Sequence, residues 1–144
     1  MYRWHPRFHI GLEYNPKVGE VHPLVTAIPV TETLNRPAII LGISSDRIGT
    51  PSGTSFYATA SKDLEYWTGL PIAPYAGVVF GTYEKRFRAI GGLNIRLPRN
   101  FTSLMQFDGV HLHPSLTYSF NDTHAATFLL IRGRDPGLTY TFSF

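Results

Sequence analysis

The chain of 144 residues carries a net charge of +3, and its basic residues are scattered apart from a cluster at 84–88, so no nucleic-acid partner is predicted. Charged residues make up only 16% and aromatic residues 14% of the sequence, which excludes an intrinsically disordered chain. There is no cysteine and no run of about 18 apolar residues, which excludes a disulfide framework, a thiolate metal site and a membrane-spanning helix.

Ten segments alternate apolar and polar residues with a period of two, and this period predicts β-strands. In chain order they are residues 7–15, 22–32, 38–46, 55–62, 72–83, 87–98, 101–108, 110–120, 124–133 and 138–144. Turn-forming residues separate the segments, with hairpin signals at "DG" (108–109) and "RDPG" (134–137). Residues 63–71 break the period and fit either a short helical turn or a loop. Pro29 would be awkward in a strand paired on both sides.

Sequential strands joined by short turns predict a meander. The predicted fold is therefore all-β: one domain over residues 1–144, forming a small antiparallel up-and-down β-barrel of eight to ten strands, with ten favoured. The domain is either the whole protein or the C-terminal barrel of a longer precursor. Such alternation arises in a soluble barrel, where the apolar face points inward, and in a transmembrane barrel, where it points outward to lipid.

The polar face of the predicted strands is rich in small residues. They are Gly11, Gly42, Gly77, Gly81, Gly92, Ser44, Ser115, Thr117, Ser119, Thr139, Thr141 and Ser143. A water-facing sheet is normally rich in Lys and Glu instead, so this composition favours a narrow polar interior and a transmembrane barrel. The polar residues predicted to face the lumen are Glu13, Arg88, Asn94, Arg96, His111 and His113. Ten strands leave at most a narrow lumen, in which Glu13 or Asp46 would neutralise the arginines.

The chain ends with apolar residues at alternate positions, namely Leu138, Tyr140, Phe142 and the terminal Phe144. This segment resembles the closing strand of bacterial outer-membrane β-barrels, and the resemblance is specific only for the last seven residues. It implies that these four residues form an assembly signal read by the barrel-assembly machinery. It also implies a porin-like transmembrane protein of the Gram-negative cell envelope, located in the bacterial outer membrane and surrounded by outer-membrane lipid.

The resemblance has further implications for the ends of the strands. Aromatic residues near strand ends would form girdles at the lipid–water interface. An even strand number would place both termini on the periplasmic side, with the turns at 99–100 and 121–123. The turns at 15–20, 47–54, 82–86, 108–109 and 134–137 would face outside. These outer turns are short, which disfavours a function that needs long outer loops, such as adhesion.

Two clusters raise the question of chemistry. His111 and His113 with Asp108 could form a two-histidine, one-carboxylate metal site, but hydrogen-bonded histidines in a polar interior are favoured. The "HPS" triplet at 113–115 has the His–Ser spacing of outer-membrane lipid deacylases, yet no second element of their pattern is present. We therefore predict no catalytic site, no metal and no cofactor.

The predicted function is a small outer-membrane barrel with a structural, anchoring or envelope-assembly role, in contact with lipid and with other envelope proteins. One alternative is a soluble β-barrel that binds a small apolar ligand. A second alternative is an outer-membrane enzyme that modifies lipid, for which Ser115 and His113 would be the candidates.

Overall fold

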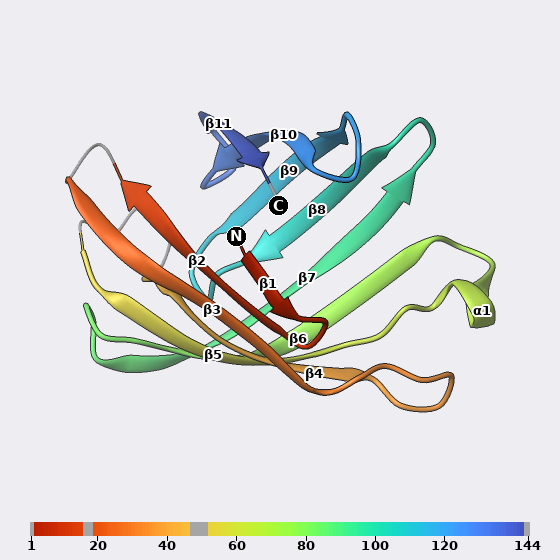
Figure 1. Ribbon diagram of the computed structural model, residues 1–144, viewed down its shortest axis with the longest axis horizontal. Coiled ribbons are helices and arrows are strands. Elements are labelled where there is room, and N and C mark those ends of the chain that lie inside the picture. Colours follow the sequence, from red (N-terminus) through yellow and green to blue (C-terminus); the bar gives the residue numbers. More distant parts are fainter. Residues whose placement is uncertain (1, 16–18, 47–51, 143–144) are drawn as a thin grey trace.

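The computed structural model describes residues 2–15, 19–46 and 52–142, which form a single curved sheet (Figure 1). Its eleven strands lie in chain order, and each pairs antiparallel with the next. The strands are β1 (Tyr2–His5), β2 (Phe8–Asn15), β3 (Glu20–Val30), β4 (Ala38–Ser45), β5 (Thr54–Ser61), β6 (Ile72–Gly81), β7 (Arg86–Leu97), β8 (Phe101–Phe107), β9 (Leu112–Ser119), β10 (His124–Ile131) and β11 (Asp135–Phe142).

The predicted all-β, antiparallel, up-and-down topology is confirmed, and all ten expected strands are present as β2 to β11. The structure adds the short strand β1, whose four residues are too few to show a period in the sequence. The segment at 63–71 contains one helical turn, α1 (Glu65–Thr68), which ends at Gly69 with a φ of 69°. In the described part of the chain, no helix is long and apolar enough to cross a membrane.

Two hairpin turns differ from the expected ones. The connection after β8 occupies four residues, and Asp108 N–H donates to the carbonyl of His111, so that Gly109 takes the left-handed φ of 90°. The last hairpin turns at Arg132–Arg134 rather than at 134–137, with Gly133 at a φ of 72°. Pro136 consequently lies inside β11. Proline is tolerated there because β11 is an edge strand, where one side needs no donor.

Pro29 lies where the ladder between β3 and β4 is interrupted. The register shifts between Ala27 and Val30, so that Ile28 and Pro29 together oppose the single residue Ile40 and form a bulge. The sequence pattern therefore identified a real irregularity, and the strand accommodates it without ending.

The two faces of the sheet differ sharply in chemistry. One face carries the large apolar side chains and leaves them exposed. Its most exposed members are Leu12, Tyr14, Val21, Leu41, Phe56, Val78, Phe87, Leu116, Phe128, Leu138, Tyr140 and Phe142. No described residue is a buried hydrophobic one, and the buried residues are polar: His22, Ser55, Thr59, Asp108 and His113. The sheet is thus polar inside and apolar outside.

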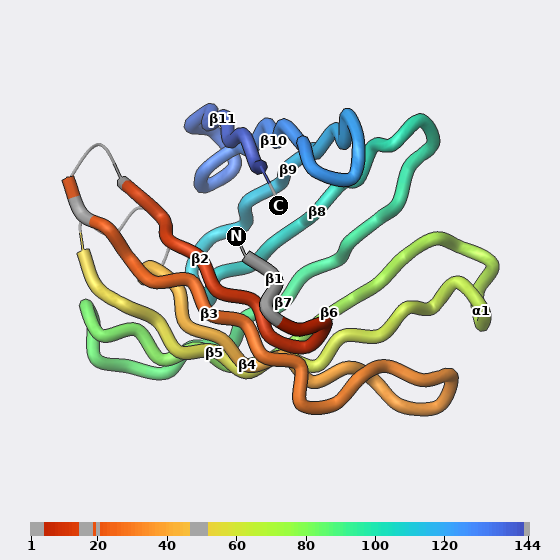
Figure 2. Tube along the Cα trace, viewed as in Figure 1, coloured from red at the N-terminus to blue at the C-terminus, as the bar shows by residue number. Residues whose placement is uncertain are grey.

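The sheet curves into a trough, as the trace in Figure 2 shows, but it is not closed. Among the described residues, no pairing joins β11 to β1 or β2. The described strands therefore form an open, strongly curved sheet, and the closed barrel stays a prediction.

Glycines on the polar face make room for neighbouring strands and rings. A Cβ on Gly42 would overlap the ring of Tyr57, its partner across the ladder, and a Cβ on Gly92 would overlap the ring of Tyr75. Each tyrosine therefore covers a glycine on the adjacent strand, an arrangement that fills a concave surface without crowding it. Gly77 lies very close to the backbone of β5, because an added Cβ would overlap the carbonyl oxygen of Ala58.

The Gly77→Ala variant should lower the free energy of unfolding by about 1–3 kcal/mol, because backbone atoms of β5 must move to admit the methyl group. Urea unfolding measures this loss. Gly137→Ala is the matched control: the nearest atoms, 3.1 Å from its Cβ, belong to the side chain of Leu129, which can rotate. The control should change stability by less than about 0.5 kcal/mol. Equal losses in both variants would contradict the contact with β5 as the cause.

Candidate functional site: the concave polar face

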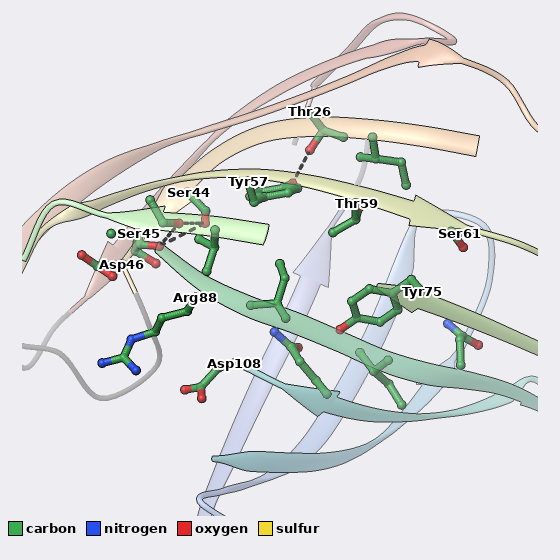
Figure 3. Close-up of a pocket in the computed structure, with 18 of the residues that line it drawn as sticks. Thr26, Ser44, Ser45, Asp46, Tyr57, Thr59, Ser61, Tyr75, Arg88 and Asp108 are labelled. Carbon is green, nitrogen blue, oxygen red and sulfur yellow. Dashed lines mark hydrogen bonds between the residues drawn. The ribbon is translucent and has the colours of Figure 1, made fainter. Parts of the chain in front are cut away.

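The concave face holds a pocket of about 630 Å³ (Figure 3). Its walls come from β3 to β8, and in β5 to β8 the residues that point into it are mainly alternate ones, as the ladder register requires. Hydroxyl-bearing side chains and four large aliphatic ones line it, and charged side chains lie at one end. The large aliphatic residues are Ile40, Val79, Ile90 and Leu104.

Hydroxyl groups join neighbouring strands across the pocket wall. Ser44 and Ser55 are hydrogen-bonded at 2.9 Å, and Ser55 also donates to the carbonyl of Ser45 at 2.9 Å. Thr26 on β3 and Tyr57 on β5 share a hydrogen bond of 3.3 Å above Gly42, which lies between them (Figure 3). These bonds satisfy polar groups that the concave face removes from water.

The charged end of the pocket is built around the hairpin between β6 and β7. The carboxylate of Glu84 accepts hydrogen bonds from Arg88 and lies 3.6 Å from Nε of Arg86. Beyond the pocket, Glu13 accepts a hydrogen bond from Ser45 at 2.6 Å. The carboxylate of Glu84 thus lies close to both guanidinium groups of this hairpin.

Asp108 and His113 form a buried pair beside the charged end, with exposed fractions of 6% and 2%. One carboxylate oxygen of Asp108 accepts the N–H groups of Val110 and His111, at 2.9 and 2.7 Å, and the other lies 2.9 Å from Nε2 of His113. Nδ1 of His113 accepts the N–H of Arg132 at 3.2 Å. The ring proton of neutral His113 therefore lies on Nε2 and is donated to Asp108.

Burial acts to raise the pKa of Asp108, but the hydrogen bonds from His111 N–H, His113 and Val110 N–H outweigh it. The net result is a pKa below the usual value for aspartate. The ionised carboxylate of Asp108 therefore stabilises the turn after β8 and, through His113, connects it to the turn after β10.

A second charged cluster lies at the opposite end of the strands. Arg96 contacts Asp63 at 2.6 Å and also Glu65, and Asp63 accepts the N–H of Glu65 at 2.9 Å. The hydrogen bonds from Arg96 and from the Glu65 backbone lower the pKa of Asp63. Lys62 reaches Glu32 at 3.2 Å, so two consecutive connections at this end are joined. These groups are exposed, and their attraction is screened by solvent.

The six residues predicted to face the lumen have different positions. Arg88 and Asn94 line the pocket, and Glu13 lies on the same face beyond it. Arg96 shares that face by register, but its guanidinium contacts Asp63 and Glu65 in the connection between β5 and β6. His113 is buried beside the pocket, where it contacts Asp108. His111 lies in the turn before β9 and not in the strand, and the structure gives its buried Nδ1 no partner.

Several pocket residues were not singled out from the sequence. Tyr57, Tyr75 and Gln106 lie on the polar face, and each occupies an alternate position that the period of its strand assigns to that face. Glu84 lies in a turn, so no period places it. Its spacing of four residues from Arg88 is the one local signal of their contact.

Ser115 and His113, the candidate residues for lipid modification, contact different partners. Ser115 donates to the carbonyl of Leu104 at 3.4 Å, whereas His113 contacts Asp108 and Arg132. In the described ranges, no group of three or more His, Asp or Glu side chains has a geometry that could hold a metal ion.

The apolar residues of the last strand lie on the outer face. Leu138, Tyr140 and Phe142 are all exposed, and they pair across the ladder with Phe128, Ala126 and His124. Phe144, the fourth residue of the predicted assembly signal, lies outside the described residues.

No family model, no curated protein and no solved structure matches this chain.

Proposed function

We propose that the chain forms a ten-stranded transmembrane β-barrel, built from β2 to β11, in the outer membrane of a bacterial envelope. Its outer face contacts lipid, and its interior is a narrow polar lumen largely filled by its own side chains. Its role is structural, anchoring or assembly-related. The proposed role does not involve catalysis.

The observation that carries the proposal is the inverted distribution of polarity. Monomeric soluble proteins rarely expose a continuous apolar patch of more than a few hundred Å². Here the exposed apolar residues extend over the outer face from β2 to β11, for example Leu12, Leu41, Val78, Phe128 and Leu138. Every buried described residue is polar instead. A lipid environment explains both halves of this distribution, because the solvent for the outer face is then hydrocarbon.

The lengths of the three longest strands support the same proposal. Tilted spanning strands need roughly 9–11 residues. Strands β3, β6 and β7 have 11, 10 and 12 residues, and most of the others have eight. The short strands would reach across the hydrocarbon core with residues of the adjoining turns.

The location and the assembly partner are supported by the C-terminal resemblance. Leu138, Tyr140 and Phe142 project from the edge strand β11, where an assembly machine could read their alternating pattern. The proposed partners are outer-membrane lipid, the barrel-assembly machinery and other envelope proteins.

The soluble alternative has one observation in its favour, which is the amphipathic pocket with its four aliphatic residues. A soluble barrel that holds an apolar ligand would, however, turn its large apolar side chains inward. The sheet does the reverse, so this alternative needs a partner that covers the whole outer face.

The direct test is the partition of the full chain, produced with a bacterial export signal, between membrane and soluble fractions. We expect it in the outer-membrane fraction, resistant to extraction by high salt and by alkaline carbonate. The same chain refolded from urea should enter phosphatidylcholine vesicles and become protected from protease there. A monodisperse monomer in buffer without lipid or detergent would contradict the proposal.

A further inference from the structure

The sheet has two edges with unpaired backbone groups. In the described residues β11 pairs only with β10, and β1 covers β2 only along Phe8–Ile10, leaving residues 11–15 without a neighbour on that side (Figure 1). We propose that these edges pair with each other and close the barrel in one specific register, with Glu13 opposite Thr139. This inference rests on the proposed function and adds the closing contact to it.

The directions of the strands favour β2 as the partner of β11. Successive strands alternate in direction, so the first and the last of the ten strands β2 to β11 are antiparallel. A contact between β1 and β11 would be parallel instead, and less stable per residue. Free edges invite pairing, and full closure removes them.

The faces of the two strands restrict the register. Outer residues of β2 are Ile10, Leu12 and Tyr14, and outer residues of β11 are Leu138, Tyr140 and Phe142. An outer residue must face an outer residue, because a shift by one residue would turn an apolar face into the lumen. Only registers that differ by two residues therefore remain.

The stagger is the displacement along the strands, counted in residues, that accumulates on going once around a closed barrel. It can be followed along the observed residue pairs. The path runs through Phe8, Ala27, Leu41, Ala58, Val78 and Ala89, resumes at Gly91, Phe107 and Leu112, and resumes again at Leu116, Phe128 and Leu138. It shifts by two residues along β7 and by four along β9, six in all, towards the level at which β2 begins. If Leu138 pairs with Tyr14, the path returns to β2 six residues beyond Phe8, where it started. These six residues and the six from β7 and β9 give a total stagger of twelve residues.

A stagger of twelve residues over ten strands corresponds to a strand tilt of about 40°, from the usual rise and strand spacing. Known transmembrane barrels have tilts of about 35–45°. Staggers of ten and fourteen residues also fall close to this range, so the tilt leaves three registers to compare.

Backbone hydrogen bonding separates the three registers. Arg7 accepts the N–H of Ile28, so odd residues of β2 bond to β3 and even residues present their backbone groups to the free edge. The stagger of ten would place Pro136 opposite Tyr14, where proline has no N–H to donate. The stagger of fourteen would pair only residues 12–15 with 139–142. The stagger of twelve pairs residues 11–15 with 137–141 and avoids the proline.

The same register suits the lumen side. Glu13 would lie opposite Thr139, whose hydroxyl could donate to the carboxylate as Ser45 already does. Gly11 would lie opposite Thr141, a small pair on a concave surface. The strand β1 could keep its contacts with Phe8–Ile10, because the pairing uses only the later part of β2.

Disulfide cross-linking of the full chain in membranes tests the register, and the natural chain contains no cysteine that would interfere. The double variant Glu13→Cys/Thr139→Cys joins directly opposite residues, whose Cα atoms should be about 4.5 Å apart. The matched controls are Glu13→Cys/Gly137→Cys and Glu13→Cys/Thr141→Cys, which represent the staggers of ten and fourteen. Diagonal positions are about 7–8 Å apart, too far for an unstrained disulfide.

We expect the 13/139 pair to form an intrachain disulfide at least about tenfold faster than either control, as seen by non-reducing electrophoresis and peptide mass spectrometry. Faster oxidation of a control pair overturns the register. Interchain dimers, or membrane-inserted protein with no cross-link, overturn closure by β2 and β11. Failure to enter membranes at all is a different result and counts against the proposed function itself.

Discussion

The Leu41→Arg variant should destabilise the membrane-inserted protein by about 2–4 kcal/mol. Leu41 lies in the middle of β4 on the outer face and pairs with Ala58, in the middle of β5. In the proposed transmembrane barrel this strand centre faces lipid near the bilayer midplane, where an arginine costs this much. Urea unfolding in phosphatidylcholine vesicles measures the loss.

The Phe87→Arg variant is the matched control, because it places the same side chain on the same face but at a strand end. Phe87 is the second residue of β7 and is 74% exposed, against 44% for Leu41. Near the interface the arginine can reach water, and the expected cost is about 0–1 kcal/mol. If the outer face met water, both variants would change stability by less than about 0.5 kcal/mol. Two small values would therefore refute the lipid-facing surface.

The depth dependence distinguishes lipid from a protein partner. A partner that covered the outer face would penalise arginine wherever it packs, including over Phe87. Only a bilayer has a cost that depends on the distance of the residue from the centre of the hydrocarbon core.

The strands and their faces could be predicted from the sequence because strand alternation is a local property. Residues such as Leu138 and Tyr140 reveal their common face from their spacing alone. The strand pairing was also accessible, because short connections force neighbours in sequence to be neighbours in the sheet. The small residues of one face correctly indicated a concave surface, where the rings of Tyr57 and Tyr75 lie over glycines.

The contacts of the charged residues could not be predicted from the sequence as well as the strands. Arg96 contacts Asp63, 33 positions away, and the sequence offers no sign of a link between a strand end and that connection. The alternation of residues 110–120 predicts that His111 lies in a strand. Its backbone N–H instead donates to the carboxylate of Asp108, which keeps His111 in the turn. In the last hairpin, Gly133 supplies the positive φ and so displaces the turn from the "RDPG" segment. In each case a specific hydrogen bond or dihedral angle outweighed the general pattern.

The Asp108→Asn variant should lower the free energy of unfolding by about 2–3 kcal/mol at neutral pH, although it changes few atoms. Both oxygens of Asp108 accept hydrogen bonds, from two backbone N–H groups and from Nε2 of His113. An asparagine has only one oxygen, so its NH₂ group must face one of these donors. His113 cannot adapt by moving its proton, because its Nδ1 accepts the N–H of Arg132.

The matched control is Asp122→Asn, which makes the same substitution in the exposed turn after β9. It should change stability by less than about 0.5 kcal/mol. A double variant, Asp108→Asn with His113→Leu, should lose less than the sum of the two single variants, because it removes the unmatched donor as well. Additive losses would show that the Asp108–His113 contact is not the cause.

The same carboxylate predicts a pH dependence. The pKa of Asp108 is lower in the folded state than its ordinary value, so the unfolded chain binds the proton more readily. The stabilisation is therefore fully present above about pH 5 and is lost as the pH falls below about 4, towards the folded pKa. Urea unfolding between pH 7 and pH 3 should show this loss in the parent chain, and Asp108→Asn should show less of it. An identical pH profile in both proteins would mean that Asp108 is not held ionised by these hydrogen bonds.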